Sequence, residues 1–375
     1  MLRRMWSRTL VLLTSALSLS IAVPVKAGSC DSLMKLTLAN TTITSAQLVG
    51  PGGFRLPPGG RAPSVELFSA FNRLPSFCRV QAEVTPARDS HIEVEVWLPE
   101  SNWNGKYLGV GNGGFAGSLN YFRLGEALNS GYVTASTDTG HQGGDREWQW
   151  SLGHPERAID FDYRAIHETS VVAKAAIQLF YGRKPDHSYF SSCSNGGRQG
   201  LMEAQRYPAD YDGIMAGAPA MSLGFKTYVS DGLDAFRRRK GKLVIYHGGN
   251  DDPQRTMNYY TRLLSRMGQR NVDGFMKLYI VPGMAHCGGG SVPNDLGQWL
   301  RPDADPRHSL YKALERWVEN GVPPKSIIAT QYNTDGDRSS GILRTRPICP
   351  YPEEARWKGE GNQDDAVNYV CGAPR

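Results

Sequence analysis

Residues 189–205 read YFSSCSNGGRQGLMEAQ. A short strand leads into a helical pattern that begins near Gly197, and Ser194 lies between the two. Small residues, Ser192 and Gly196, stand two positions before and two positions after this serine. A strained strand–turn–helix that exposes a serine nucleophile requires small residues there, because the neighbouring backbones come too close for larger side chains. The motif alone occurs often by chance, since Ser192 replaces the usual glycine.

Two later strands supply the partners that a serine nucleophile needs. An apolar run at residues 243–246 leads into a loop that contains Asp251, and a strand at residues 277–281 leads into a loop that contains His286. The order Ser, Asp, His, each after a strand, is the order found in α/β-hydrolases. His286 would take the proton of Ser194, and Asp251 would orient the imidazole and stabilise its charged form.

Two cysteines adjoin the predicted catalytic residues. Cys193 precedes Ser194, and Cys287 follows His286. If the two are bonded, their Cα atoms lie about 5 to 6 Å apart, and the bond holds the nucleophile loop against the histidine loop. The alternative is that they are two ordinary structural cysteines, but a cysteine beside each proposed partner is a specific signal.

With these features the chain resembles the tannase and feruloyl esterase family of α/β-hydrolases, in which neighbouring cysteines link the serine and histidine loops. The resemblance covers most of residues 30–371, and its motifs are NWNGK (102–106), GNGGFAG (111–117), STDTGH (136–141), YRAIHET (163–169), CSNGGRQG (193–200), AQRYP (204–208) and AGAPA (216–220). It implies an α/β-hydrolase fold and ester hydrolysis. Strands that alternate with helices likewise predict a mostly parallel central sheet with helices on both faces.

The glycine-rich turn at residues 111–117 follows an early predicted strand. A glycine loop is often only a turn, but in this fold such a loop supplies a backbone N–H to the oxyanion hole, beside the N–H of the residue after the nucleophile. We therefore expect the oxyanion hole to be formed by Asn195 together with Gly113 or Gly114.

Three other polar residues lie in or near these motifs. Asp138 and His141 are candidates to line the site, although for Asp138 we favour a hydrogen bond to local loop backbone. His167 lies on a helix predicted over residues 163–181, where we expect it to pack or to cap.

The N-terminus reads as a targeting segment. Residues 1–27 combine a basic head, a short apolar run and small residues before a cleavage position after Ala27. We expect cleavage there, leaving residues 28–375 as a single catalytic domain that is periplasmic or secreted. The alternative, a lipoprotein acylated at Cys30, has a poor recognition motif. The apolar run is too short and too broken for a comfortable membrane span.

Charge and cysteine content exclude several classes of function. Residues 1–27 carry four Lys or Arg and no acid, so their removal lowers the formal net charge from +6 to +2. No basic run suggests a nucleic-acid partner. All six cysteines remain after cleavage, which suits an oxidising compartment. With Cys193 and Cys287 paired, the natural local pairs are Cys30–Cys78 and Cys349–Cys371, although sequence alone allows fifteen connectivities. No C-x-x-C motif is present, and we expect neither a metal nor a cofactor.

One part of the family pattern is missing. The family inserts a long lid domain, often with calcium, between the AGAPA motif and the strand that leads to the acid. Here only residues 221–230 separate Ala220 from Asp231, where the resemblance resumes, and they offer no clustered oxygen ligands for calcium. We therefore expect the lid domain to be absent.

Two hypotheses from different classes follow. The first is an exported serine esterase that cleaves small-molecule esters of hydroxybenzoic or hydroxycinnamic acids, through Ser194, His286 and Asp251, with Asp252 as the alternative acid. The second is a non-catalytic remnant without its lid that binds an aromatic ligand or a partner. The complete triad and the paired cysteines favour the esterase.

Overall fold

The computed structural model describes residues 28–57, 70–226, 229–300 and 305–374. The predicted targeting segment, residues 1–27, lies outside the described residues. In chain order the elements are η1 (Cys30–Lys35), β1 (Thr41–Val49), β2 (Phe77–Val84), β3 (Ile92–Pro99), β4 (Lys106–Val110), α2 (Tyr121–Asn129), β5 (Val133–Thr137), η2 (Gln149–Ser151), α3 (Pro155–Ile159), the π-helix η3 (Asp160–Arg164), α4 (Ala165–Tyr181), β6 (His187–Cys193), α5 (Asn195–Arg206), β7 (Gly213–Gly217), α6 (Asp234–Arg238), β8 (Lys242–Gly248), α7 (Gln254–Met267), α8 (Gln269–Asp273), β9 (Met276–Val281), α9 (Leu310–Asn320), β10 (Ile327–Thr334), β11 (Asp337–Ile348), β12 (Glu354–Trp357), η4 (Ala366–Asn368) and β13 (Tyr369–Gly372).

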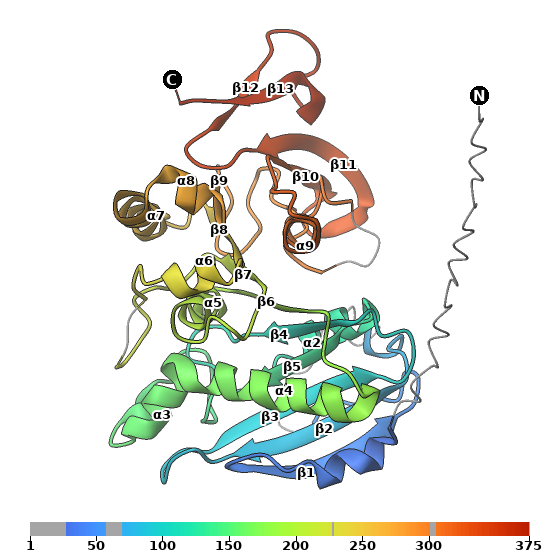
Figure 1. The fold of residues 1–375 in the computed structure, drawn as a ribbon. Helices are drawn as coiled ribbons and strands as arrows, with labels where there is room; N and C mark the ends of the chain where they lie inside the picture. The colour runs from blue at the N-terminus through green and yellow to red at the C-terminus, as the bar shows by residue number, and fades with distance from the viewer. Residues whose placement is uncertain (1–27, 58–69, 227–228, 301–304, 375) are drawn as a thin grey trace, which may run out of the picture.

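The central sheet has the strand order β1-β2-β3-β5-β4-β6-β7-β8-β9. From β5 to β9 every neighbouring pair is parallel. The pairs β1–β2, β2–β3 and β3–β5 are antiparallel and form one end of the sheet (Figure 1). The prediction of a mostly parallel α/β-hydrolase sheet is confirmed. The carboxyl ends of parallel strands meet at one edge, so the loops after β4, β6, β8 and β9 gather there.

Helices cover both faces of this sheet, as predicted. The side chains of neighbouring residues on a strand point to opposite faces, so Tyr189 and Phe190 of β6 enter different hydrophobic clusters. The cluster of Phe190 also contains buried residues of α4, α5 and α7, whereas the cluster of Tyr189 contains buried residues of α2 and α9. Burial of both faces accounts for the near-continuous apolar runs in the central strands.

The C-terminal part adds two small antiparallel sheets, β10–β11 and β12–β13. They lie at the opposite end of the molecule from β1 (Figure 1). The disulfides pair Cys30 with Cys78, Cys193 with Cys287 and Cys349 with Cys371, and these are the pairs that the sequence predicts. In the part of the chain that the structure describes, no helix is long and apolar enough to cross a membrane.

Candidate active site

Ser194 alone forms the turn between β6 and α5. The strand extends to Cys193 and the helix begins at Asn195, so the predicted helix start near Gly197 is too late. One residue suffices because Ser194 adopts φ 65° and ψ −124°, a conformation that side-chain-bearing residues rarely occupy. Neighbouring backbone holds it there: Ser194 N–H donates to Gly217 O at 2.9 Å, and Ala220 N–H donates to Ser194 O at 3.0 Å.

Neighbouring atoms lie so close to this turn that only small residues fit around it. A Cβ atom on Gly196 would lie 1.9 Å from Ser192 Oγ, and one on Gly197 would lie 2.3 Å from Gly217 O. A larger side chain at position 196 would therefore displace the elbow. This explains the pattern of small residues that first marked Ser194 in the sequence.

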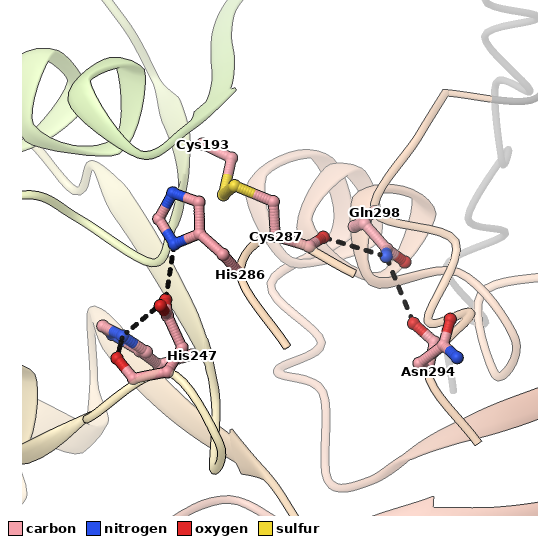
Figure 2. Close-up of a disulfide and its surroundings, with 7 residues drawn as sticks. Cys193, His247, His286, Cys287, Asn294 and Gln298 are labelled. Atoms are coloured by element: carbon pink, nitrogen blue, oxygen red, sulfur yellow. Dashed lines mark hydrogen bonds and ion pairs between the residues drawn. A yellow bond between two sulfur atoms is a disulfide. The ribbon is translucent and has the colours of Figure 1, made fainter. Parts of the chain in front are cut away.

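The loops after β8 and β9 bring an acid and a histidine together. His286 Nδ1–H donates to Asp251 Oδ2 at 2.6 Å (Figure 2). The His286 side chain is half exposed, and within the described residues its Nε2 atom has no hydrogen-bond partner. That nitrogen is therefore free to accept a proton. Asp252 follows with φ 46° and makes no such contact in the described chain, so the geometry favours Asp251 over Asp252.

Gly248 allows these two loops to approach each other. A Cβ atom on Gly248 would lie 2.3 Å from Met284 O and 2.4 Å from Ala285 O. Asn250 N–H donates to Met284 O at 3.1 Å, which ties the acid loop to the histidine loop. The short distance between Asp251 and His286 thus depends on a glycine at the end of β8.

A second histidine contacts the same carboxylate, and the sequence interpretation gave it no role. His247, near the end of β8, is buried, with its Nε2 atom 3.2 Å from both Asp251 Oδ2 and Asp251 O. Its Nδ1 atom lies 2.8 Å from Thr256 Oγ1. Burial lowers the pKa of His247, partly offset by Asp251 and reinforced by His286, so the ring stays neutral at neutral pH. In the sequence, His247 could have been noticed from its position near the end of a predicted strand, four residues before Asp251.

The Cys193–Cys287 disulfide joins the residue before Ser194 to the residue after His286. Its Cα atoms lie 5.9 Å apart. In Figure 2, His286 lies between this disulfide and His247. Cys287 O accepts a hydrogen bond from the buried Gln298 side chain at 3.4 Å, so the histidine loop is held from a second direction.

The glycine loop after β4 lies against the elbow. A Cβ atom on Gly111 would lie 3.0 Å from Gly196 Cα, and Asn112 N–H donates to Gln199 Oε1 of α5 at 3.1 Å. Gly114 has φ 53°, and an added Cβ would lie 2.3 Å from Asp145 O, whereas one on Gly113 would meet nothing within 4 Å. The two glycines predicted as oxyanion donors therefore lie on a loop that packs against α5, the helix that begins with the third predicted donor, Asn195.

The other polar candidates have structural partners. Asp138 accepts N–H bonds from Glu93 at 2.9 Å and Gly140 at 2.8 Å, in line with the backbone role that we favoured. Burial raises its pKa to about 8. His167 packs in a stacked arrangement on Tyr207, with ring centroids 3.8 Å apart. Asp138 therefore stabilises the loop after β5, and His167 packs α4 against Tyr207 at the end of α5.

An aromatic cluster, which sequence reasoning missed, lies beside the glycine loop. His141 stacks on Trp150 with ring centroids 3.7 Å apart, and its Nε2 atom lies 2.7 Å from Phe115 O. Phe161 and Phe225 complete the cluster, with centroids 5.6 Å apart. Its members come from separate loops and short helices, so no sequence periodicity reveals it.

Buried polar groups attach this cluster to the elbow helix. The Asp162 carboxylate accepts the backbone N–H groups of Phe225 at 2.9 Å and Lys226 at 2.6 Å. The Arg198 guanidinium, fully buried, donates to Asp162 O at 2.8 Å and to Asn195 Oδ1 at 2.7 Å. The segment after β7 is therefore fixed to the start of α5. In the described residues, no group of His, Cys, Asp and Glu is placed to hold a metal ion.

Residues 78–230 and 225–372 match the protein-family model described as "Tannase and feruloyl esterase". Among curated proteins, an uncharacterized esterase of Xanthomonas campestris is 26% identical over 99% of this chain and 96% of its own length. A probable feruloyl esterase B-2 of Aspergillus oryzae is 25% identical over 92% of this chain and 95% of its own length.

Solved structures show the same fold. A crystal structure of feruloyl esterase B from Aspergillus oryzae superposes with a TM-score of 0.80, at 22% identity, over 92% of this chain and 99% of that chain. A tannin acyl hydrolase from Aspergillus niger gives a TM-score of 0.65, at 17% identity, over 92% of this chain and 95% of that chain.

Proposed function

This chain belongs to the tannase and feruloyl esterase family and is a carboxylic ester hydrolase, and from that premise we propose that it is an exported serine esterase acting on esters of hydroxybenzoic or hydroxycinnamic acids. One observation carries the catalytic assignment: His286 Nδ1–H donates to Asp251 Oδ2 at 2.6 Å, on a loop that a disulfide joins to the residue before Ser194.

In the proposed mechanism, Ser194 Oγ attacks the ester carbonyl while His286 Nε2 accepts the serine proton. Asp251 holds the imidazole in the required tautomer. The oxyanion of the tetrahedral intermediate receives hydrogen bonds from Asn195 N–H and from the N–H of Gly113 or Gly114. His286 then protonates the leaving alcohol. Water attacks the acyl-enzyme by the same route in reverse, and the acid is released.

The aromatic cluster supports an aromatic acid as the substrate. Phe115 directly follows the proposed oxyanion glycines, and Phe225 belongs to the segment that follows Ala220, whose N–H is bonded to Ser194 O. Phe115, Phe225 and Trp150 are each partly exposed. Partly exposed rings on segments that adjoin the elbow favour stacking with an aromatic acyl group.

We also propose that the family's lid domain is absent. The two matched parts of the family model meet at residues 225–230. The alignment to the Xanthomonas esterase spans 561 positions, many more than the 375 residues of this chain. Without a lid the pocket should be open, so bulky esters should be hydrolysed with high Michaelis constants and weak discrimination. We expect chelation with EDTA to change neither activity nor Tm, and a substantial fall in either would reveal a metal site.

Export rests on two features. Residues 1–27 have the composition of a cleavable signal peptide. The three disulfides are typical of a protein that folds outside the cytosol. N-terminal sequencing of protein from the periplasm and the medium would locate the cleavage site and the compartment. The alternative of a non-catalytic remnant is not favoured, because the relatives are esterases.

The decisive experiment is an ester panel with purified oxidised enzyme. Nitrophenyl acetate tests for esterase chemistry, and methyl gallate, methyl ferulate, chlorogenate and short alkyl esters test the acyl group. Higher kcat/KM for the aromatic acids than for alkyl esters of similar size is the expected result. Hydrolysis of alkyl esters alone would refute the aromatic assignment, and no hydrolysis of any ester would refute the serine mechanism.

A further inference from the structure

A cavity lies apart from the proposed catalytic residues. It has a volume of about 770 Å³ and is lined by residues of β9, α7 and the C-terminal strands β11, β12 and β13. Neither Ser194 nor His286 lines it. Its walls include the apolar side chains Met257 and Ile280. This volume lies within the range of small-molecule sites in proteins.

Two arginines and an aromatic ring give this cavity its chemistry. Arg344 and Arg346 are two residues apart on β11, so both point to the same face of the strand and both line the cavity. The Arg346 guanidinium carbon lies 4.0 Å from the ring centroid of Tyr369, which also lines the cavity. The site thus combines a flat aromatic wall with cationic groups.

These guanidinium groups have few anionic partners. Arg344 Nε lies 3.8 Å from Asp364 Oδ1, beyond hydrogen-bond distance. Among the described residues, Arg346 forms no ion pair within 4 Å. Burial lowers the pKa of Arg346, with Asp364 opposing the effect and Arg344 adding to it. Both groups are partly buried. A bound anion would therefore gain charge-assisted hydrogen bonds that the chain itself does not supply.

We infer that this cavity binds a small aromatic monocarboxylate, with its carboxylate on Arg346 and Arg344 and its ring against Tyr369 and the apolar wall. Glu353 and Glu354 also line the cavity and are exposed. Their charges disfavour ligands that carry several negative charges. Identification of the natural ligand as the released acid rests on the proposed function, because an aromatic carboxylate is the product of that reaction.

The cavity adjoins the loops that carry the proposed acid and base. Pro282 lines it and stands four residues before His286. The preceding residue, Val281, accepts the N–H of Gly249 at 2.8 Å, two residues before Asp251. A ligand here contacts the start of the histidine loop without contacting the catalytic residues.

Isothermal titration of the wild-type enzyme with benzoate tests the inference, with benzyl alcohol as the uncharged probe of similar shape. We expect saturable benzoate binding, and binding at least roughly tenfold weaker for benzyl alcohol and for the Arg346→Gln variant. Arg344→Gln should weaken binding in the same direction. Arg338→Gln removes a charge from the same strand outside the cavity and should leave binding unchanged. Equal benzoate affinity in wild type and Arg346→Gln would overturn the inference, as would no binding to wild type at millimolar benzoate.

Two controls separate folding and function from binding. Arg346→Lys keeps the charge and should retain part of the affinity, and thermal melts show whether each variant is folded. Esterase assays on the same preparations test the proposed function independently. Binding that depends on Arg346 in an enzyme that hydrolyses no ester would refute the esterase proposal and leave the cavity site intact. Active enzyme whose affinity for benzoate does not depend on Arg346 would refute the cavity site and leave the esterase proposal intact.

Discussion

The Nε2 atom of His247 lies 3.2 Å from Asp251 Oδ2, the same oxygen that accepts the 2.6 Å hydrogen bond from His286. The neutral His247 ring, oriented by Thr256 through its Nδ1 atom, can donate its Nε2–H to this carboxylate. We therefore expect His247 to act as a positioning residue for Asp251 and, through Asp251, for His286.

Replacement of His247 by alanine should lower kcat by roughly tenfold to a hundredfold, because Asp251 loses a donor that fixes its position. His247→Gln keeps a donor and should restore part of the rate. Unchanged kcat in His247→Ala would contradict the positioning role.

Ser194→Ala should abolish ester hydrolysis, leaving only the modest acceleration due to binding and the oxyanion hole. The fold and the three disulfides should persist, because alanine removes only the hydroxyl group. Turnover of nitrophenyl acetate and a thermal melt measure the two effects. Near-normal turnover would rule out the serine mechanism.

A matched pair of variants assigns the acid. Asp251→Asn should cause a large loss of kcat, because the amide cannot hold the His286 tautomer or stabilise the imidazolium. Asp252→Asn should cause a smaller loss, because Asp252 does not contact His286. Steady-state kinetics on both variants decides between them, and the reverse order would place the triad acid at residue 252.

Removal of the Cys193–Cys287 bond should reduce catalysis as well as stability. Each of the bonds Cys193–Cys287 and Cys30–Cys78 closes a long loop, 94 and 48 residues in sequence separation. The chain-entropy model gives each roughly 4 to 5 kcal/mol of free energy of unfolding. Only the first joins the serine and histidine loops, and a small misplacement there costs about a hundredfold in rate.

The matched experiment compares the two double alanine variants at a temperature where both are folded. Replacement of Cys193 and Cys287 should lower kcat strongly, whereas replacement of Cys30 and Cys78 should lower Tm and largely preserve kcat. Peptide mapping under non-reducing conditions verifies the pairing. Free thiols at Cys193 and Cys287 in active enzyme would refute the role of this disulfide.

Asp138 should make stability depend on pH. Its folded-state pKa is raised by burial to about 8, from an ordinary value of 3.8. Between pH 4 and pH 8 the folded state holds a proton on Asp138 that the unfolded state has lost. The contribution of this proton to the free energy of unfolding is complete below about pH 4. It decreases by up to about 1.4 kcal/mol per pH unit as the pH rises towards 8. Asp138→Asn cannot titrate and can keep the backbone contacts. Its stability relative to wild type should rise from pH 5 to pH 8 in urea unfolding, and a constant difference would refute the assignment.

Local chemistry explains why the candidate site residues stood out in the sequence. Ser194 was recognisable because the strained turn requires small residues at fixed spacing on either side of it. Those residues, Ser192 and Gly196, lie so close together that a Cβ atom on Gly196 would meet Ser192 Oγ. Asp251 and His286 were recognisable because parallel strands bring their carboxyl ends to one edge. The helix start was predicted too late because Asn195 and Gly196 lack helical character in sequence, whereas the single-residue turn forces them into the helix.

The sequence by itself determined the α/β-hydrolase fold, the family and the order of the candidate triad, because each depends on periodicity or on motifs of adjacent residues. Only the tertiary structure placed His247 on Asp251, assembled the cluster of Phe115, Trp150 and Phe225, and enclosed the cavity lined by Arg346. These arrangements join residues from distant elements through side-chain packing and buried hydrogen bonds. Such contacts depend on how the sheet, its helices and the C-terminal strands come together, and no local pattern along the chain encodes them.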